Sequence, residues 1–319
     1  MAAQITVAIP TSERVDLLDR AIESILNQTV RDIDIVVVDN SRDADTRNRL
    51  GRQVPAVRVI RTARSTFFAG AMNTALRDAA TPFVAVLNDD AFLNPRWAEE
   101  ALLTFARDDS VGSVATKVMN ATRPDIIDST GDQLDLAGRA TNRGWGEVDR
   151  GQYSSESHVF SAAGSCAIYR RCAFVEAGGF DDAFVAYLED VDLGFRLQLL
   201  GYRCVFNPAC EAHHVGGATK KPRLYALWLT ERNMVWNIVK NMPTSVIRRN
   251  LKLLARHQSK PAPVVGGASW RAWASGKAAA WVAPADLWAK RKRVQETRQV
   301  PDAHIESLLR VAEIRACHL

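Results

Sequence analysis

The chain has 319 residues, 47% of them hydrophobic and 24% charged, with a formal net charge of +5, which is the composition of an ordinary globular protein of about two domains. No apolar run approaches the ~20 residues that cross a bilayer, and the start of the chain lacks a secretory signal, so we expect a cytoplasmic protein, soluble or peripheral at the inner face of the cell membrane. Five cysteines without a CxxC pattern favour reduced thiols over a disulfide framework.

The first part of the chain is predicted to alternate strands and helices. Apolar runs and helical spacing predict strands at 5–9, 33–38, 57–60 and 83–87, and helices at about 17–26 and 70–80. Strands that are apolar on both faces and separated by helices indicate a mostly parallel sheet covered on each side. Ligands bind beyond the carboxyl ends of such strands, so Pro10-Thr11, Asp39-Asn40 and Asp89-Asp90 are expected along one edge.

The middle of the chain is predicted to be less regular. Residues 129–157 are rich in Gly, Asp, Arg and Ser and indicate loops or short strands. We expect extended structure at 160–169 and 203–206, a helix that begins near Glu189 and stops at Gly201, a helix at 223–241 and a linker at 261–267. We divide the chain into a domain of residues 1–241, with halves at 1–120 and 121–241, and a helical, basic region of residues 242–319.

The charge is unevenly distributed between these parts. Residues 220–319 hold 19 Lys and Arg against 6 Asp and Glu, whereas residues 1–219 hold 22 against 30. The basic part also carries Trp270, Trp273, Trp281, Trp288, Lys290, Arg291, Lys292 and Arg293. This pattern suits an anionic membrane surface contacted through residues 266–298; the alternatives are core tryptophans beside a solvated face, or stacking on nucleic acid. Because no nucleic-acid motif occurs, we expect no nucleic-acid partner.

The first chemical motif is Asn88-Asp89-Asp90, at the end of an apolar strand. Neighbouring carboxylates in a loop can direct oxygens toward one hard cation, and Mg²⁺ is commonly held by one or two carboxylates together with substrate phosphates. A metal-bridged nucleoside diphosphate is therefore the natural ligand of this motif. The alternative is a solvated acidic turn, which the position after an apolar strand of the same sheet as Asp39 disfavours.

The second motif is the acidic stretch Glu189-Asp190-Val191-Asp192. Three acids in four residues repel one another, which raises the pKa of at least one of them. A carboxylate in an enclosed pocket can remove a proton from an attacking alcohol, and acids also cap the positive end of a helix. We assign Asp190 to chemistry and Asp192 to capping or orientation.

The third motif is the pair His213-His214. Adjacent side chains of a strand point to opposite faces, so only one imidazole can face the site. A single histidine is more often structural, but one neutral imidazole would complete a metal site begun by the aspartates. The chain has no GxSxG, P-loop or GxGxxG turn, so the hydrolase, NTPase and dehydrogenase interpretations lack their defining loops.

Together these segments resemble the family-2 glycosyltransferases of GT-A fold, in particular the bacterial rhamnosyl- and galactofuranosyltransferase type. The resemblance covers roughly residues 4–241 and consists of collinear motifs, namely VAIPTSERVDLLDRAIESILNQT, IDIVVVDNS, GAMNTALRDA, FVAVLNDDAFL, GSCAIYRRCAFVEAGGFDDAF, YLEDVDLGFRLQLLGYRCVFNP and AHHVGG. Asn88 stands where many members have Asp, which makes Asp90 the main expected ligand. Spacing to Gly216-Gly217 favours His214 over His213 as the match to the family's histidine.

The resemblance implies inverting transfer of a sugar from a nucleoside diphosphate sugar to an acceptor hydroxyl. Carried over position by position, the expected donor contacts are Pro10, Thr11, Glu13, Asp39, Gly70, Asn73 and Asp89. Asp90 and His214 would hold Mg²⁺ or Mn²⁺ on the diphosphate, where the ion acts as a Lewis acid. Asp190 matches the family's base, which deprotonates the acceptor hydroxyl.

The donor and the acceptor stay open at this point. An aspartate that accepts from a base suits uridine and thymidine alike, so UDP-sugars and dTDP-sugars are both expected candidates. The basic, Trp-rich region favours a lipid-linked glycan in cell-surface polysaccharide assembly, and the alternative is a soluble natural-product acceptor. Other interpretations are a sugar-phosphate nucleotidyltransferase, which should carry a Gly-rich phosphate loop, and a non-catalytic nucleotide-binding domain.

Overall fold

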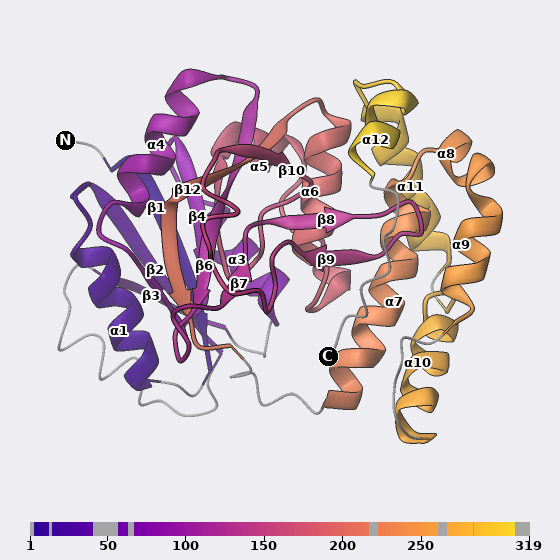
Figure 1. Cartoon of the computed structure of the whole chain (residues 1–319), viewed down its shortest axis with the longest axis horizontal. Coiled ribbons are helices and arrows are strands. Elements are labelled where there is room, and N and C mark those ends of the chain that lie inside the picture. The colour runs from indigo at the N-terminus through magenta and orange to yellow at the C-terminus, as the bar shows by residue number, and fades with distance from the viewer. Residues whose placement is uncertain are drawn as a thin grey trace.

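The fold was analysed in a computed structural model (Figure 1), which describes residues 3–12, 15–40, 57–62, 67–216, 223–260, 267–282 and 284–309. Within these ranges ten strands form one sheet with the order β10-β12-β6-β11-β4-β1-β2-β3, to which β5 and β7 are added at β12 and β6. The strands of the sheet are β1 (Ile5–Thr11), β2 (Ile33–Asp39), β3 (Val57–Arg61), β4 (Phe83–Leu87), β5 (Ala91–Leu93), β6 (Val111–Asn120), β7 (Ile127–Ser129), β10 (Ser157–Val159), β11 (Cys166–Arg170) and β12 (Arg203–His214).

The sheet is mostly parallel, as the sequence predicts. The pairs β1–β2, β1–β4, β2–β3 and β6–β12 run parallel, whereas β11 lies antiparallel between β4 and β6. A separate hairpin is formed by β8 (Asp132–Leu134) and β9 (Ala140–Asn142). The irregular region expected at 129–157 is therefore built of short strands and loops.

Helices cover both faces of the sheet. Alternate residues of one strand enter different cores: Ile35 and Val37 of β2 pack with α1 (Val15–Leu26) and α4 (Trp97–Arg107), whereas Val36 and Val38 pack with α3 (Phe68–Leu76). Successive side chains of a strand point to opposite faces, and both faces are apolar here because both are covered. The three-layer arrangement places the polar strand ends together at one edge of the sheet.

Helix α6 (Glu189–Leu199) lies between the sheet and the C-terminal helices. Its Leu193 and Leu197 pack toward the sheet, whereas Phe195 and Leu199 pack into a core that includes Met242 and other residues of the C-terminal part. The helices of that part are α7 (Arg223–Asn241), α8 (Thr244–Arg249), α9 (Leu251–Gln258), α10 (Gly267–Ala279), α11 (Pro284–Thr297) and α12 (Asp302–Leu308). They gather at one end of the molecule, beside α6 (Figure 1).

Several element boundaries differ from the sequence expectation. Strand β12 continues to His214 instead of stopping at Phe206, because an irregularity between Asn207 and Glu211 accommodates Pro208 within the strand. Strand β11 begins only at Cys166, and α5 (Arg171–Glu176) and the short 3₁₀ helix η1 (Asp182–Phe184) follow it. Of the expected linker, residues 261–266 lie outside the described ranges.

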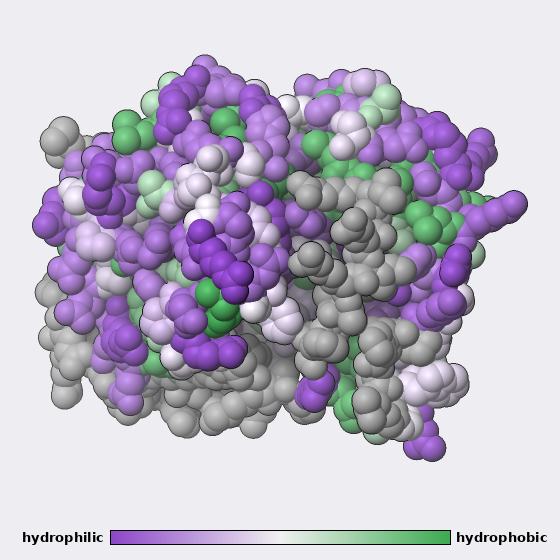
Figure 2. Space-filling view, in the orientation of Figure 1, coloured by the Kyte–Doolittle hydropathy of each residue, from purple (hydrophilic) through white to green (hydrophobic). Residues whose placement is uncertain are grey.

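The described cysteines are all free, and Cys172 is exposed while the other three are buried. No helix in the described part of the chain is both long and apolar enough to span a membrane. In the view of Figure 2, hydrophobic and hydrophilic residues are interspersed over the C-terminal helices. The boundary at residue 241 stays a prediction.

Candidate active site

The polar ends of β1, β2 and β4 meet at one edge of the sheet. The register of β1 and β2 places Thr11 beside Asp39, and the Asn40 amide donates to the Thr11 carbonyl over 2.8 Å. The Thr11 hydroxyl donates to Oδ2 of Asp89 over 2.9 Å. The expected gathering of the three strand ends is therefore confirmed. Asp39 is fully buried, so a donor that reaches it must do so from the edge of the sheet.

Asp90 and His214 lie together at the same edge. Strand β5 pairs with β12 so that Ala91 lies opposite His214, and Nε2 of His214 is 3.1 Å from Oδ1 of Asp90. His213 points the other way, with its Nε2 3.5 Å from Oε1 of Glu211. The strand geometry thus separates the two imidazoles as expected, and His214 is the one beside Asp90.

A third acidic residue, Asp128 of β7, holds the other side of this histidine. Its Oδ2 is 2.8 Å from Nδ1 of His214. Burial lowers the pKa of His214, but the hydrogen bonds and charges of Asp128 and Asp90 outweigh it and raise the pKa to about 9. No sequence pattern marks Asp128, because it is a single aspartate in an irregular segment. The pairing of β7 with β6 brings it to His214.

The donor set at this edge fits a divalent cation that substrate completes. A carboxylate oxygen of Asp90 and an imidazole nitrogen of His214 are ligands that Mn²⁺ and related ions accept. Asp128 on the far ring nitrogen is the arrangement that commonly orients a metal-binding histidine. Among the described residues no cluster of three or more acidic, His or Cys side chains is arranged to hold an ion alone, so diphosphate oxygens would have to supply further ligands.

Asp190 lies in the first turn of α6 and is half-buried. Its Oδ2 accepts the Gly164 amide over 2.7 Å, and its Oδ1 accepts the Val191 amide over 2.8 Å. Burial raises the pKa of Asp190, and these backbone bonds oppose that rise. A Cβ on Gly164 would lie 3.1 Å from Oδ2 of Asp190, so the glycine permits the close approach. A raised pKa suits a carboxylate that accepts a proton.

A second buried carboxyl, Asp132 of β8, lies near Asp190. Its Oδ2 accepts the Ser161 hydroxyl over 2.7 Å, and it is 2% exposed. Burial and the charge of Asp190 raise the pKa of Asp132 well above its ordinary value. Burial and the charge of Asp190 therefore favour the protonated form of Asp132. Sequence reasoning missed Asp132, because only the fold brings β8 to the start of α6.

The Asp90–His214 pair and Asp190 belong to one continuous edge. The backbone amide of Asn88 donates to the Ser165 carbonyl over 2.9 Å, and Ser165 directly follows Gly164, which contacts Asp190. The Asn88 side chain also lies 3.5 Å from Nε2 of His214. Residues more than a hundred positions apart in the chain are thereby joined through two backbone segments.

The remaining predicted residues have different surroundings. Pro10 lies in β1 and Gly70 lies in α3, whereas Glu13 is outside the described residues. The side-chain Nδ2 of Asn73 donates to the Phe180 carbonyl over 2.8 Å and to Oδ1 of Asp182 over 2.6 Å. Its Oδ1 accepts a hydrogen bond from the Phe180 backbone amide over 2.9 Å. Asn73 thus fastens α3 to the segment before Asp190, and its contact with a donor stays a prediction.

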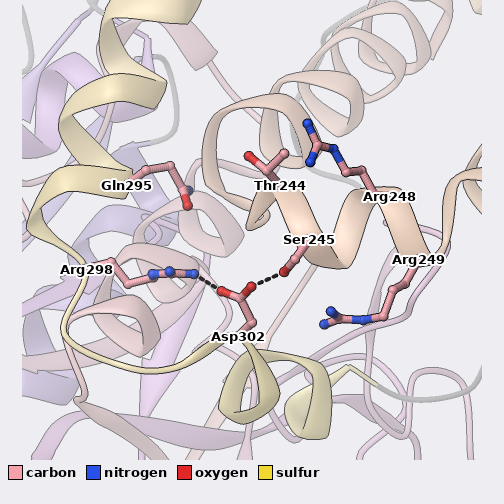
Figure 3. A pocket seen from close by; sticks show the side chains of 7 residues that line it. All are labelled: Thr244, Ser245, Arg248, Arg249, Gln295, Arg298 and Asp302. Carbon is pink, nitrogen blue, oxygen red and sulfur yellow. Dashed lines mark hydrogen bonds and ion pairs between the residues drawn. The ribbon is translucent and has the colours of Figure 1, made fainter.

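A pocket also occurs among the C-terminal helices (Figure 3), lined by Thr244, Ser245, Arg248, Arg249, Gln295, Arg298 and Asp302. Ser245 and Arg298 both point to Asp302 and bond to it, and Arg249 pairs with Glu306 over 2.8 Å. Much of the charge that lines this pocket is therefore neutralised by ion pairs within the protein. We place the candidate active site at the sheet edge, where ionisable groups with shifted pKa values converge.

Comparisons with known proteins show the family to which the chain belongs. Residues 6–177 match the sequence model of the family described as Glycosyl transferase family 2. The chain is 29% identical over 228 residues to N-acetylglucosaminyl-diphospho-decaprenol L-rhamnosyltransferase of Mycobacterium tuberculosis, covering 63% of this chain and 73% of that protein. It is 28% identical over 232 residues to the uncharacterized protein y4gI of Sinorhizobium fredii, covering 68% of this chain but only 25% of that much longer protein.

The solved structures also show the fold. A crystal structure of GalNAc-T7 with UDP, GalNAc and Mn²⁺ superposes with a TM-score of 0.62 at 16% sequence identity, covering 75% of this chain and 49% of that one. At that identity the likeness establishes the architecture alone. It confirms the expected GT-A arrangement of a mostly parallel sheet flanked by helices.

Proposed function

Because this chain belongs to glycosyl transferase family 2, we propose that it transfers a sugar with inversion from a nucleoside diphosphate sugar to an acceptor hydroxyl. The observation that carries the proposal is the continuous edge that joins the Asp90–His214 pair to Asp190 through Ser165 and Gly164. This arrangement offers a place for the diphosphate on one side and a base on the other. A reaction that needs a leaving anion and an activated alcohol uses both.

The donor side of the reaction would be held by the strand ends. Asp39 would accept a hydrogen bond from the base, which suits the imide N–H of uracil and thymine and favours a UDP- or dTDP-sugar. Asp90 and His214 would hold Mg²⁺ or Mn²⁺, which when bound neutralises charge on the diphosphate as a Lewis acid. Asp128 would keep the His214 ring oriented through Nδ1. The Thr11 hydroxyl fixes the Asp89 carboxylate beside these strand ends.

The acceptor side would depend on Asp190. Its carboxylate would take the proton of the acceptor hydroxyl as that oxygen attacks the anomeric carbon from the side opposite the diphosphate, which inverts the configuration. The backbone amides of Gly164 and Val191 fix the direction of the carboxylate. The raised pKa of Asp132 favours its neutral form, which would avoid a second full negative charge beside the base.

The acceptor that we propose is a lipid-linked glycan of cell-surface polysaccharide assembly, met at the inner face of the membrane. The mycobacterial relative is named for a diphospho-decaprenol acceptor. Trp270 of α10 and Trp288 of α11 are 56% and 52% exposed, and in the turn between these helices Trp281 and Val282 are 54% and 80% exposed. Lys292 and Arg293 are exposed as well, so apolar and cationic groups are available to an anionic surface.

The structure narrows which residues of 266–298 can meet a membrane. Arg291 is buried and donates to the Met242 carbonyl over 2.9 Å. Lys290 pairs with Asp181 over 2.8 Å, and Trp273 is half-buried. These three side chains therefore serve packing within the protein, which was one of the alternatives that the sequence left open.

Nucleotide binding and transfer together test the proposed reaction. Calorimetry with UDP, dTDP and GDP, with and without Mn²⁺, should show metal-dependent binding of UDP or dTDP. Asp190→Asn should keep that binding and lower kcat by roughly 10²–10⁴-fold, the usual contribution of a general base. The matched control is Asp109→Asn, a fully exposed aspartate. Unchanged transfer in Asp190→Asn would show that Asp190 is not the base. Absence of binding to all three nucleotides would favour the alternative of a non-catalytic domain.

A further inference from the structure

The segment that leads into Asp190 has an unusual backbone. Among the described residues, the non-glycine residues with positive φ are Val185, Tyr187 and Leu188, with φ of 68°, 68° and 65°. Left-handed backbone is uncommon outside glycine, and for a β-branched residue such as Val185 it is a genuine outlier. All three lie within five residues of Asp190, the proposed base. The free-energy cost of the left-handed backbone is therefore concentrated next to that residue.

Val185 is at the centre of a tight turn. Its φ and ψ are 68° and −64°, and the Ala186 amide donates to the Phe184 carbonyl over 2.7 Å. This is the γ-turn of positive φ, a rare and strained form. Such conformations persist only where the surrounding structure holds them, and they cluster at active sites. The strained turn at Val185 must therefore be held by another part of the chain.

Side chains of α7 hold the strained segment through hydrogen bonds to its carbonyls. The Asn233 amide group is fully buried and donates to the carbonyls of Phe184, Ala186 and Tyr187 over 2.9, 3.0 and 2.6 Å. Arg232 donates to the Phe184 carbonyl over 3.0 Å and to Oδ1 of Asn233 over 2.8 Å. The backbone acceptors that the strained turns leave without regular partners are thus satisfied by one helix.

The same helix continues these contacts at both ends of the segment. Arg232 also donates to the Ala183 carbonyl over 2.7 Å, and Asn237 donates to the Leu188 carbonyl over 3.2 Å. The buried Lys240 ammonium lies 2.7 Å from Oδ2 of Asp181 and 2.8 Å from Oδ1 of Asp192. Lys240 therefore bridges the residues on either side of the strained segment.

Helix α11 reaches the same place. Lys290 pairs with Oδ1 of Asp181 over 2.8 Å. Burial raises the pKa of Asp181, but the charges of Lys240 and Lys290 outweigh it and hold the pKa well below its ordinary value. Asp181 in turn accepts the Ala183 amide over 3.1 Å, so the ion pair acts directly on the start of the segment.

Apolar packing completes the hold. The ring of Phe184 is fully buried and meets the Trp236 ring edge-on, with the centroids 5.8 Å apart. The small core around it includes Ala280 and Leu287, so the ends of α10 and α11 enclose it with α7. The C-terminal helices therefore surround the segment on its apolar as well as its polar side.

We propose that α7 and α11 position the base, with Asn233 as the central positioning residue, so that the C-terminal helices are required for catalysis and not only for contact with a membrane. This inference rests on the proposed function. The strained turns direct the chain so that α6 begins with Asp190 against the Gly164 amide. Without the bonds from α7, the segment would relax toward ordinary backbone and Asp190 would leave that position.

The central test replaces Asn233 with Ala. The expected result is a loss of kcat of tenfold or more, with KM for the donor and metal-dependent nucleotide affinity within twofold of the wild type. A residue needed only for folding would lower the thermal midpoint and nucleotide binding together. The matched control is Thr230→Ala on the same helix, since the Thr230 hydroxyl donates to the Ala226 carbonyl within α7 itself. This variant should leave kcat, KM and nucleotide affinity unchanged.

A second pair of variants covers the case in which Asn233→Ala does not fold. Lys290→Met removes a half-buried ammonium from Asp181, and Asp286→Asn removes only the exposed partner of the same lysine, 3.0 Å away. We expect several-fold lower kcat at unchanged nucleotide affinity in Lys290→Met and no change in Asp286→Asn. A stable Lys290→Met protein with the kcat of the wild type would overturn the role of α11.

Hydrogen exchange separates this inference from the proposed function. Mass spectrometry of Asn233→Ala, or of Lys290→Met if the first does not fold, should show faster exchange in residues 181–191 and unchanged exchange in β1 and β4. That result stands even if no sugar is transferred by the wild type, in which case only the proposed function fails. Unchanged exchange in 181–191, or unchanged kcat in a folded Asn233→Ala protein, overturns the positioning role.

Discussion

The two sides of the candidate site are held by different kinds of structure. On the donor side, Asp39 and Asp90 follow strands whose register places the strand ends together, and backbone hydrogen bonds between strands maintain that register. On the acceptor side, Asp190 follows a strained segment whose carbonyls are held by side chains of α7. The first side depends on the sheet, and the second depends on individual side chains from a distant part of the chain.

This difference predicts how each side responds to change. A sheet register is shared among many backbone bonds, so single side-chain substitutions outside the site should leave the donor side in place. A strained turn depends on a few donors, so the loss of one of them should displace the base. Donor binding and transfer are therefore expected to separate in variants of the acceptor side, and to fail together in variants of the donor side.

The largest of the remaining effects is expected on the donor side, at Asp128. Asp128→Ala removes the acceptor of His214 Nδ1, and loss of such an orienting carboxylate typically weakens metal binding by roughly 10–100-fold. Calorimetric titration of Mn²⁺ in the presence of UDP or dTDP measures this directly, without transfer. Asp128→Asn keeps an acceptor oxygen and should lose less.

The matched control for this variant is Asp125→Ala, an exposed aspartate of the same segment. It should bind Mn²⁺ as the wild type does. Equal Mn²⁺ affinity in Asp128→Ala and Asp125→Ala would show that Asp128 does not act on the donor side, and the Asp90–His214 pair would then have to be oriented by β5 and β12 alone.

The next effect is a pH dependence that belongs to the acceptor side. Burial raises the pKa of Asp190 above the ordinary aspartate value, and a base must be unprotonated to act. As the pH falls through this raised pKa, kcat at saturating donor should fall about tenfold per pH unit. The groups whose titration is coupled to its charge are Asp132 and Tyr169, and the pKa of each is raised well above its ordinary value.

Asp190→Asn provides the comparison for this profile. Its residual activity should be flat over the acid range, because the group that titrates is gone. If kcat of Asp190→Asn falls at low pH with the same midpoint as kcat of the wild type, the titration belongs to another group. An acid limb at the ordinary aspartate value would contradict the buried environment of Asp190.

The smallest effect is expected at the exposed face of the C-terminal helices. Trp281→Ser combined with Val282→Ser should lower partitioning to phosphatidylglycerol-containing vesicles several-fold, because the lost area no longer enters the interface. Vesicles of phosphatidylcholine alone should bind little of either protein. Point variants are preferable to deletion of 266–298, since that segment also carries Lys290 and Arg291, which pack within the protein.

Trp145→Ser is the control for surface exposure. Trp145 is 51% exposed, like Trp281, but lies outside the C-terminal helices. Equal partitioning of the Trp281→Ser/Val282→Ser protein and the wild type would refute the membrane contact. The positioning role of α7 and α11 would stand, because it rests on buried contacts of Asn233 and Lys290 and not on the exposed turn at residues 281–282.

Much of the donor side was predictable from the sequence. Continuous apolar runs that end in polar residues identify buried parallel strands and the edge at which their ends meet, and Thr11, Asp39 and Asp89 are found there as expected. His214 could be preferred over His213 from local spacing. The strand ends gather as expected because a strand is a local pattern and the carboxyl ends of parallel strands meet at one edge. The donor and metal roles of these residues stay predictions.

Other residues could not be found in this way. Asp128 and Asp132 lie in short strands whose partners are set by pairing with distant segments. Asn233 looks like an ordinary polar residue of a helix. No local pattern marks any of them, because their importance comes from what they contact across the fold.

The sequence by itself determined the layered fold, the polar edge of the sheet and the position of Asp190 at the start of a helix, since each follows from periodicity and local composition. Only the tertiary structure decided which groups hold Asp190, which carboxylates lie beside His214, and which cations of the C-terminal region point inward. Hydrophobic periodicity acts over a few residues, whereas burial, carboxylate coupling and backbone strain depend on groups that folding alone brings together.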